Sequence, residues 1–188
     1  MAKITNPIIP SDYPDVDVIR VEDTYYMVST TMHFMPGAVI LRSYDLGHWE
    51  TISHIYTELT DAPAYHLDDG KEAYGQGMWA PCIRWHKGTF YLITTNISGG
   101  GNFIVTAKNP QGPWSEPHFL ENARGIDPSL FFDEDGTCYY IGQRENSRGG
   151  RYNGDCEIWI QKLDLQTFRL EGEAHPVLYG FQRNAIWP

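Results

Sequence analysis

The segment Ile126-Asp127-Pro128-Ser129-Leu130-Phe131, followed by Gly136-Thr137-Cys138-Tyr139-Tyr140, reads as an apolar strand, a tight turn and an aromatic strand. The same pattern occurs twice earlier in the chain, as Pro14-Asp15-Val16-Asp17-Val18-Ile19-Arg20 leading to Asp23-Thr24-Tyr25-Tyr26, and as Trp79-Ala80-Pro81-Cys82-Ile83-Arg84 leading to Gly88-Thr89-Phe90-Tyr91. The copies open at Asp15, Ala80 and Asp127, which precede the turn threonine by nine, nine and ten residues. The register is kept although the identities differ.

An aromatic residue follows each copy at the distance expected of a second hairpin. It lies 25, 25 and 31 residues after the turn threonine, at Trp49, Trp114 and Phe168, and for Trp49 and Trp114 we expect a structural role. Repeats of roughly 40 to 65 residues that each contain four strands are typical of β-propeller blades. We therefore expect one domain over residues 1–188, with blades at about 10–70, 75–122 and 123–180.

The remaining sequence favours an all-β fold. Period-two alternation and β-branched or aromatic runs predict strands, whereas no long stretch has the 3.6-residue periodicity of an amphipathic helix. The predicted strands cover residues 16–21, 25–30, 39–43, 83–85, 90–95, 103–107, 130–132, 138–142 and 157–162. Two longer irregular segments, 56–77 and 145–154, are predicted to be loops that shape a site.

Three blades do not close a ring. A blade buries its faces only against neighbouring blades, so two apolar sheet faces would stay bare. Trp187-Pro188 falls where the innermost strand of a fourth blade is expected to begin. We therefore interpret the chain as the N-terminal part of a larger propeller, truncated before the fourth blade. The alternatives are a separate partner chain, or self-association that completes the ring.

The composition restricts the classes of partner. A net charge of -10 and a pI near 5.0 argue against nucleic acid, whose binders need clustered Lys and Arg. The sequence has no signal-peptide core and no transmembrane run, so we expect a cytoplasmic location and no membrane partner. The seven His residues show no paired ligand spacing, which predicts no protein-built metal site, and the three Cys residues are expected to be free thiols.

Two of the three repeats open with a carboxylate. Innermost strands of a propeller start around the central axis, so Asp15 and Asp127 are expected to meet on one face. Glycoside hydrolysis requires two or more carboxylates in one pocket, roughly 6.5 to 9.5 Å apart in an inverting enzyme. The alternative is structural, because Asp at a strand start often caps a turn. Asp17 competes with Asp15, either as the catalytic base or as an anchor of its strand.

The second strand of each blade returns to the same face, so the residues at its far end are expected to border the pocket. The predicted substrate-binding residues there are Met32, His33, Phe34, Asn96 and Gln143. The alternative is that these are ordinary solvated loop positions. Trp79 is a further candidate, because an indole face suits the apolar side of a sugar ring; its alternative role is a core position between blades.

Several motifs, taken in order, resemble glycoside hydrolase family 43. They are Asn6-Pro7, Tyr13-Pro14-Asp15, Asp23-Thr24-Tyr25-Tyr26-Met27, Pro36-Gly37, Ser43-Tyr44-Asp45-Leu46-Gly47-His48-Trp49-Glu50, Trp79-Ala80-Pro81 and Gly125-Ile126-Asp127-Pro128-Ser129. The resemblance covers essentially the whole chain. It implies a five-bladed β-propeller, of which this chain supplies about three blades, and membership among inverting β-xylosidases, α-L-arabinofuranosidases and arabinanases.

The resemblance also implies roles for individual residues. Asp15 falls on the catalytic base, which activates water, and Asp127 falls on a third carboxylate, which tunes the pKa of the general acid and orients it. The family's usual Asp-Pro-Ser at the base reads Asp15-Val16-Asp17 here. The general acid is expected to be a Glu that opens the fourth blade; residues 184–188 look like the approach to it, so this chain alone is expected to lack it. No organic cofactor is implied, although some relatives hold a cation such as calcium on the central axis.

The sequence therefore predicts an inverting glycoside hydrolase that releases terminal α-L-arabinofuranosyl or β-D-xylosyl residues from plant-polysaccharide oligosaccharides. Exo action on one terminal pentose is expected, because residues 31–37 resemble the family's aromatic loop at the terminal-sugar subsite. The alternative is a carbohydrate-binding propeller that performs no hydrolysis. A WD40 or kelch-type scaffold is disfavoured, because no Gly-His to Trp-Asp pattern recurs along the chain.

Overall fold

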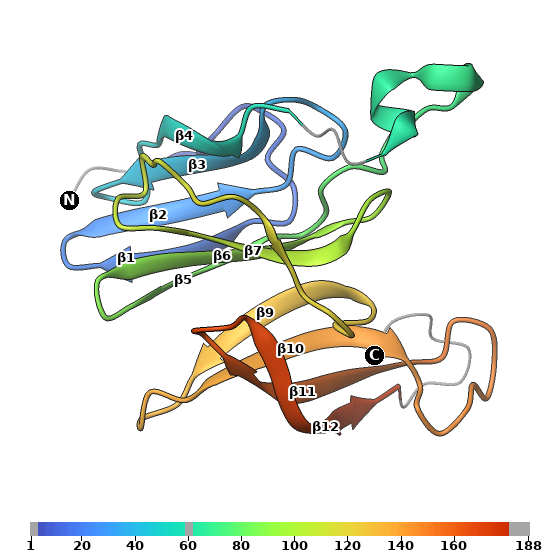
Figure 1. Ribbon diagram of the computed structural model, residues 1–188. Helices are drawn as coiled ribbons and strands as arrows, with labels where there is room; N and C mark the ends of the chain where they lie inside the picture. The colour runs from blue at the N-terminus through green and yellow to red at the C-terminus, as the bar shows by residue number, and fades with distance from the viewer. Residues whose placement is uncertain (1–3, 59–61, 181–188) are drawn as a thin grey trace.

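The computed structural model describes residues 4–58 and 62–180. Within these residues the chain forms three four-stranded antiparallel sheets that follow one another along the sequence (Figure 1). In each sheet the strands lie side by side in sequence order. The prediction of an all-β fold is confirmed. No helix in this part of the chain is long and apolar enough to cross a membrane.

The strands fall into three sets. The first sheet consists of β1 (Asp17–Val21), β2 (Thr24–Ser29), β3 (Gly37–Ser43) and β4 (Glu50–Tyr56). The second sheet consists of β5 (Cys82–His86), β6 (Thr89–Asn96), β7 (Gly101–Ala107) and β8 (His118–Phe119). The third sheet consists of β9 (Ile126–Phe132), β10 (Cys138–Glu145), β11 (Cys156–Asp164) and β12 (Arg169–Tyr179). Two short 3₁₀ helices, η1 (Pro63–His66) and η2 (Asp68–Gly70), lie in the β4–β5 segment, which projects away from the sheets (Figure 1).

Tight turns close the innermost hairpin of each sheet. β5 and β6 are joined by Lys87 and Gly88 alone, both at positive φ (46° and 77°), a backbone that matches the twist of paired strands. The β9–β10 turn is longer, and Gly136 at φ 86° donates its N–H to the carbonyl of Asp133 at 2.9 Å. The turn threonines recognised in the sequence therefore mark the return of each innermost hairpin.

Apolar side chains fill the spaces between consecutive sheets. Val28, Ile40 and Leu92 are fully buried between the first and second sheets, and Ile104 and Tyr140 are fully buried between the second and third. β1 contacts β5, and β5 contacts β9, so the innermost strands of the three sheets are adjacent in turn. Burial on this scale stabilises each junction by roughly 1.5–3 kcal/mol per large side chain. The starts of the innermost strands are thereby fixed relative to one another.

The N-terminal segment covers the other face of the first sheet. Val39 and Leu41 of β3 point away from the second sheet and pack with Ile9 and Tyr13. Successive side chains of β3 point to opposite faces, so Ile40 faces the second sheet while Val39 and Leu41 face the N-terminal segment. The segment that leads to Asp15 is therefore anchored on a sheet rather than free.

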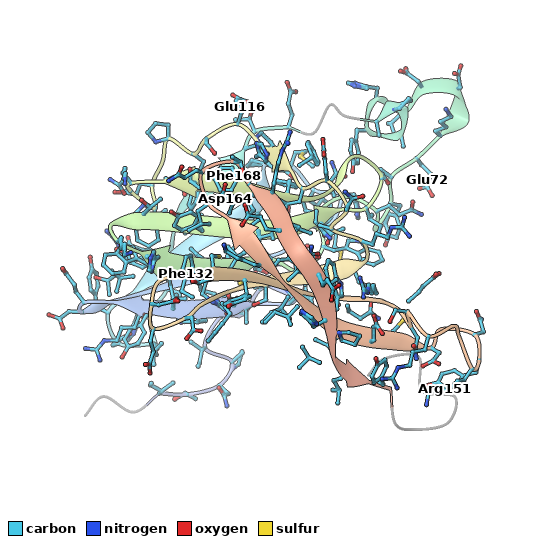
Figure 2. The ribbon with its side chains drawn as sticks, turned by 60° about the horizontal axis from the view of Figure 1, so that its bottom comes forward. Glu72, Glu116, Phe132, Arg151, Asp164 and Phe168 are labelled. Carbon is cyan, nitrogen blue, oxygen red and sulfur yellow. The ribbon has the colours of Figure 1, made fainter. Side chains whose placement is uncertain are left out.

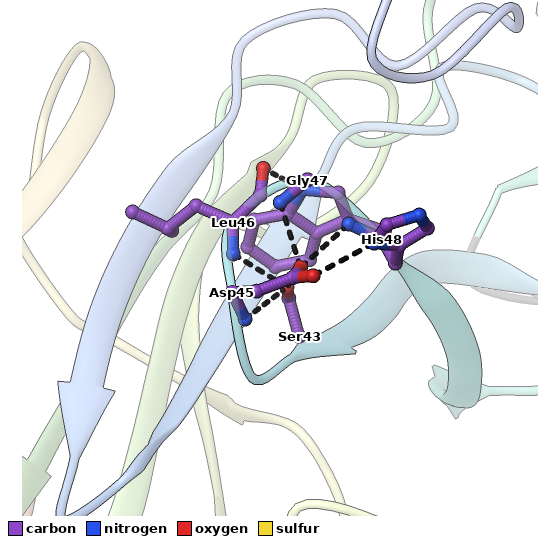
Figure 3. A network of polar contacts seen from close by, with 6 residues as sticks. Ser43, Asp45, Leu46, Gly47 and His48 are labelled. Atoms are coloured by element: carbon purple, nitrogen blue, oxygen red, sulfur yellow. Dashed lines mark hydrogen bonds and ion pairs between the residues drawn. The ribbon is translucent and has the colours of Figure 1, made fainter. Parts of the chain in front are cut away.

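The β3–β4 turn is held by a compact set of polar contacts (Figure 3). The Ser43 hydroxyl accepts a hydrogen bond from the Leu46 N–H at 2.8 Å, and the Asp45 carboxylate accepts bonds from the His48 ring (2.7 Å) and backbone (2.8 Å). These bonds, the His48 side chain first, hold the pKa of Asp45 well below its usual value. The turn presents Trp49, which packs on the covered face of the first sheet and donates its indole N–H to the Leu46 carbonyl at 3.0 Å.

The other two aromatic residues of the second hairpins also pack as structural residues. Trp114 packs against the core between the first and second sheets. Phe168, at the β11–β12 turn (Figure 2), lies against the His118 ring of β8 with ring centroids 5.0 Å apart. These two outer hairpins therefore each tie their own sheet to the preceding one.

Candidate active site

Asp15 and Asp127 occupy matching places in the first and third sheets. Asp15 lies two residues before β1, and Asp127 is the second residue of β9. Both have a left-handed backbone, with φ 52° and 53°. Asp is one of the few residues that adopt this conformation at low cost. The repeat seen in the sequence thus extends to an unusual backbone at both carboxylates.

Hydrogen bonds fix the residue before each of these positions. The Pro14 carbonyl accepts from the Ser29 hydroxyl (2.7 Å) and the Thr30 N–H (3.3 Å). In the second sheet, the Trp79 carbonyl likewise accepts from the Thr94 hydroxyl at 2.7 Å. In the third sheet, the residue before Asp127 pairs with β10. The opening position of each repeat therefore follows a point held by the neighbouring strand.

The two carboxylates interact electrostatically. Desolvation raises the pKa of Asp127, and the nearby charge of Asp15 raises it further, although the side chains of both residues reach solvent. A like charge within range disfavours ionisation of its neighbour. The fold therefore brings together two acidic side chains that are far apart in the sequence.

Asp17 has a structural partner that Asp15 lacks. The Asp17 carboxylate accepts hydrogen bonds from the Ile83 N–H at 2.9 Å and from the Arg84 guanidinium at 2.6 Å. Among the described residues, none donates a hydrogen bond to the Asp15 carboxylate. Asp17 is therefore an anchor between the first and second sheets, whereas the Asp15 side chain is exposed and has no such role among the described residues.

Four of the predicted substrate-binding residues line one cavity of about 670 Å³. They are Met32, His33, Phe34 and Trp79. The wall also includes Pro14, which precedes Asp15, together with His54, whose pKa is lowered by burial. Trp79 donates its indole N–H to the Gly75 carbonyl at 2.8 Å, which fixes the ring in the wall. A volume of this size is typical of small-molecule pockets.

A cluster of three aromatic rings, those of His33, Phe34 and Tyr74, lines this cavity. The His33 ring makes tilted contacts with the rings of Phe34 and Tyr74, with centroids 4.3 and 4.6 Å away, and its Nδ1 accepts a hydrogen bond from the Gly75 N–H at 2.9 Å. Phe34 and Tyr74 are 66% and 73% exposed, so both side chains are accessible to a ligand in the cavity. Sequence reasoning missed Tyr74, because the β4–β5 segment has no periodicity; its only signal was an aromatic residue within a predicted site-shaping loop.

Asn96 and Gln143 do not line this cavity. Asn96 is fully buried, and its side-chain oxygen accepts hydrogen bonds from the Tyr65 hydroxyl and from the Gly99 N–H (3.1 Å). Gln143 is 7% exposed on β10, opposite Ile126, and its side-chain nitrogen has no hydrogen-bond partner among the described residues. Asn96 thus anchors the β4–β5 segment, while Gln143 lies beside the strand that carries Asp127.

No group of three or more His, Cys, Asp or Glu side chains within residues 4–58 and 62–180 is arranged to hold a metal ion. No cation site is therefore assigned within these residues. Residues 184–188, the expected approach to the general acid, lie outside the described residues. Neither Asp15 nor Asp127 lines the cavity itself, although Pro14, next to Asp15, does. Two carboxylates within electrostatic range of each other are nevertheless groups that glycoside hydrolysis requires.

The comparisons with known proteins agree with this class. The chain belongs to the glycosyl hydrolases family 43, whose family model matches residues 4–187. It is 47% identical over 190 residues to a xylosidase/arabinosidase of Butyrivibrio fibrisolvens, covering 100% of this chain and 36% of that protein. It is 42% identical over 139 residues to a non-reducing end alpha-L-arabinofuranosidase of Bacteroides ovatus, covering 72% of this chain and 25% of that protein.

A solved structure shares the arrangement of the three sheets. The xylan beta-1,4-xylosidase from Bacillus halodurans C-125 superposes with a TM-score of 0.79 at 35% identity, covering 95% of this chain and 34% of that one. The chain therefore spans between about a quarter and a third of the length of these three relatives.

Proposed function

We propose that the protein is an inverting glycosidase that releases terminal α-L-arabinofuranosyl or β-D-xylosyl residues from plant-polysaccharide oligosaccharides. The observation that carries the proposal is that Asp15 and Asp127 stand at matching left-handed positions of two sheets and within electrostatic range of each other. The residue before Asp15, Pro14, lines a cavity that also contains exposed aromatic side chains. Membership of family 43 and the names of the relatives support it.

Asp15 is the proposed catalytic base. Its carboxylate is exposed and takes no hydrogen bond from the described residues, so it is available to remove a proton from a water molecule that attacks the sugar. Asp127 is the proposed modulator. Its negative charge raises the pKa of any carboxylic acid placed beside it, which keeps a neighbouring general acid protonated and able to protonate the leaving group. That acid is expected beyond the described residues.

The aromatic cluster of His33, Phe34 and Tyr74 supports recognition of a sugar. Aromatic faces pack against the apolar C–H face of a pyranose or furanose ring, and their exposure leaves them free to do so. Trp79 provides a fixed indole in the same cavity. A cavity with one such wall suits a single terminal pentose, which favours exo action.

The same proposal includes a five-bladed propeller, of which this chain supplies about three blades. On the third sheet, Phe131, Ile141 and Ile158 alternate with core residues and remain partly exposed, with Phe131 at 48%. An apolar sheet face of this kind needs a cover. The remaining blades, supplied by a longer chain or by a second chain, would cover it.

The test is turnover of aryl α-L-arabinofuranoside and aryl β-D-xyloside by the protein expressed from its whole reading frame, with Asp15→Asn and Asp127→Asn beside it. Asn keeps the left-handed backbone, so loss of activity is not an effect of strain. Each variant is expected to lose about 10²–10⁴-fold in kcat, the usual contribution of acid–base catalysis. Asp23→Asn, whose side chain is fully exposed at the far end of β1, is the matched control.

Full turnover by both variants would refute the catalytic assignment. If the unmodified protein binds xylo- or arabino-oligosaccharides in calorimetry but hydrolyses neither aryl substrate, the protein is a carbohydrate-binding propeller instead.

A further inference from the structure

Arg84 connects all three sheets. The residue belongs to β5. Its Nη1 donates to the Asp17 carboxylate of β1 at 2.6 Å. On the other side, its Nε donates to the Leu130 carbonyl at 3.0 Å and its Nη2 to the Ser129 hydroxyl at 3.3 Å, both in β9. One side chain of the second sheet therefore holds the innermost strands of the first and third.

The residues that Arg84 binds lie next to the candidate catalytic carboxylates. Asp17 is two residues after Asp15, and Ser129 is two residues after Asp127. Two residues of chain span at most about 7 Å, so a shift of either partner is expected to displace the carboxylate that lies two residues earlier in the chain. Since β1 and β9 belong to different sheets, the distance between the two carboxylates depends on what connects these strands.

Stability alone does not account for this arrangement. The side chains of Arg84 and Asp17 are 32% and 28% exposed, and an ion pair with this much access to water contributes little, at most about 1 kcal/mol. If the only role of Arg84 were to form an ion pair, its bond to the Asp17 carboxylate would suffice. Two further N–H groups of Arg84 instead donate hydrogen bonds to β9. A planar guanidinium offers five donors in fixed directions, which suits it to hold two strands at a set separation; a lysine ammonium does not.

We propose that Arg84 is a positioning residue that sets the separation between the Asp15 and Asp127 carboxylates by bonding to β1 and β9 at once. This rests on the proposed function, in which the two carboxylates act on one sugar. Arg84 does not touch the reacting atoms, so its effect is on how well the carboxylates are placed rather than on how tightly the substrate binds.

The test compares Arg84→Lys and Arg84→Ala in the protein expressed from its whole reading frame. Arg84→Lys keeps a cation near Asp17 and loses the directed bonds to β9. We expect its kcat on an aryl pentoside to fall about 10–100-fold, because a misplacement of a catalytic group by about 1 Å can lower the rate about 100-fold. The KM is expected to change less than about three-fold. Added guanidinium chloride, at concentrations too low to unfold the protein, is expected to restore part of the kcat of Arg84→Ala.

Arg42 offers the matched control. Its guanidinium binds the Glu50 carboxylate at 2.5 and 2.8 Å within the first sheet, and among the described residues it makes no hydrogen bond to another sheet. Arg42→Lys is expected to keep wild-type kcat, and Arg42→Ala is expected to show no response to guanidinium. A kcat for Arg84→Lys within about two-fold of wild type would overturn the proposal. A fall without guanidinium rescue, matched by an equal loss of folded protein, would overturn it as well.

Failure of the proposed function has a different outcome. In that case the unmodified protein itself hydrolyses neither aryl substrate. Crystal structures of the unmodified protein and of Arg84→Lys then decide the positioning proposal directly. A changed distance between the Asp15 and Asp127 carboxyl groups supports it, and an unchanged distance overturns it.

Discussion

Gly125, directly before Ile126 and Asp127, is the position where one added methyl group should disturb the candidate site most clearly. Its φ of 95° lies in the region that glycine adopts without strain. A β-carbon at Gly125 would overlap the carbonyl oxygen of Gln143 and lie 2.7 Å from the carbonyl carbon. In Gly125→Ala, β9 must therefore move away from β10, or the paired backbone must deform.

Comparison with Gly149→Ala separates the cost of the left-handed backbone from the cost of the steric overlap at Gly125. It has φ 89°, and nothing lies within 4 Å of an added β-carbon. Both alanine variants incur a left-handed penalty of about 1–2 kcal/mol, of which about 0.4–1 kcal/mol is offset by the lower entropy of the unfolded chain. Gly125→Ala adds an overlap worth about 1–3 kcal/mol and the loss of a strand hydrogen bond worth about 1 kcal/mol. We therefore expect it to be destabilised by about 2–4 kcal/mol more than Gly149→Ala.

The assay is thermal unfolding of both variants, followed by circular dichroism, together with kcat on an aryl pentoside. In a domain of this size, about 1 kcal/mol shifts Tm by roughly 2–4 °C, so the two Tm values should differ by roughly 4–16 °C. The kcat of Gly125→Ala should also fall, because β9 carries Asp127, while that of Gly149→Ala should not. Equal Tm values would refute the reasoning, since the close approach of Gly125 to Gln143 would then have no energetic consequence.

Two further predictions follow from ionisable groups. The raised pKa of Asp127 means that the folded state favours the protonated carboxyl group over the charged carboxylate. The stability gained from the protonated form is fully present below the unfolded pKa of about 3.9 and is lost as pH rises through the folded pKa. Asp127→Asn should therefore raise Tm at neutral pH but not in acid, and equal shifts at both would contradict this. Burial raises the pKa of Cys82 to about 11 and of Cys138 to about 12, so iodoacetamide should label neither in the folded protein at neutral pH. Peptide mass spectrometry would contradict this by finding either one labelled as fast as in unfolded protein.

The sequence was most informative about the inner strands. β5, β6 and β7 are rich in β-branched and aromatic residues, and short turns fix their register, so pattern and propensity agree. The outer strands β4, β8 and β12 were not predicted. β8 has two residues, and β12 contains Gly172 and Pro176, pairs irregularly with β11 and is largely exposed. An edge strand with one solvated face lacks the apolar run that marks a strand in a sequence.

Some features of the candidate site could likewise be predicted from the sequence, and others could not. The pairing of Asp15 with Asp127 could be predicted because it depends on the repeat register, which counting along the sequence reveals. The place of Asn96 could not, because its partner Tyr65 lies in a 3₁₀ segment whose path no local pattern specifies. The structural role of Asp17 was equally hidden, since it depends on Arg84 in another sheet.

The backbone at the two carboxylates suggests why this repeat can carry a site. Asp15 and Asp127 share a left-handed conformation, whereas Ala80, at the matching place in the second sheet, does not. Such a conformation costs of order 1 kcal/mol and persists only where surrounding contacts impose it. Those contacts are on both sides: the preceding residue is bonded to the neighbouring strand, and two residues later each strand is bonded to Arg84. In the first and third sheets, the same kinds of hydrogen bond therefore hold the chain on both sides of the opening position. Because that position is an aspartate in both sheets, these bonds also hold a carboxylate in a fixed place.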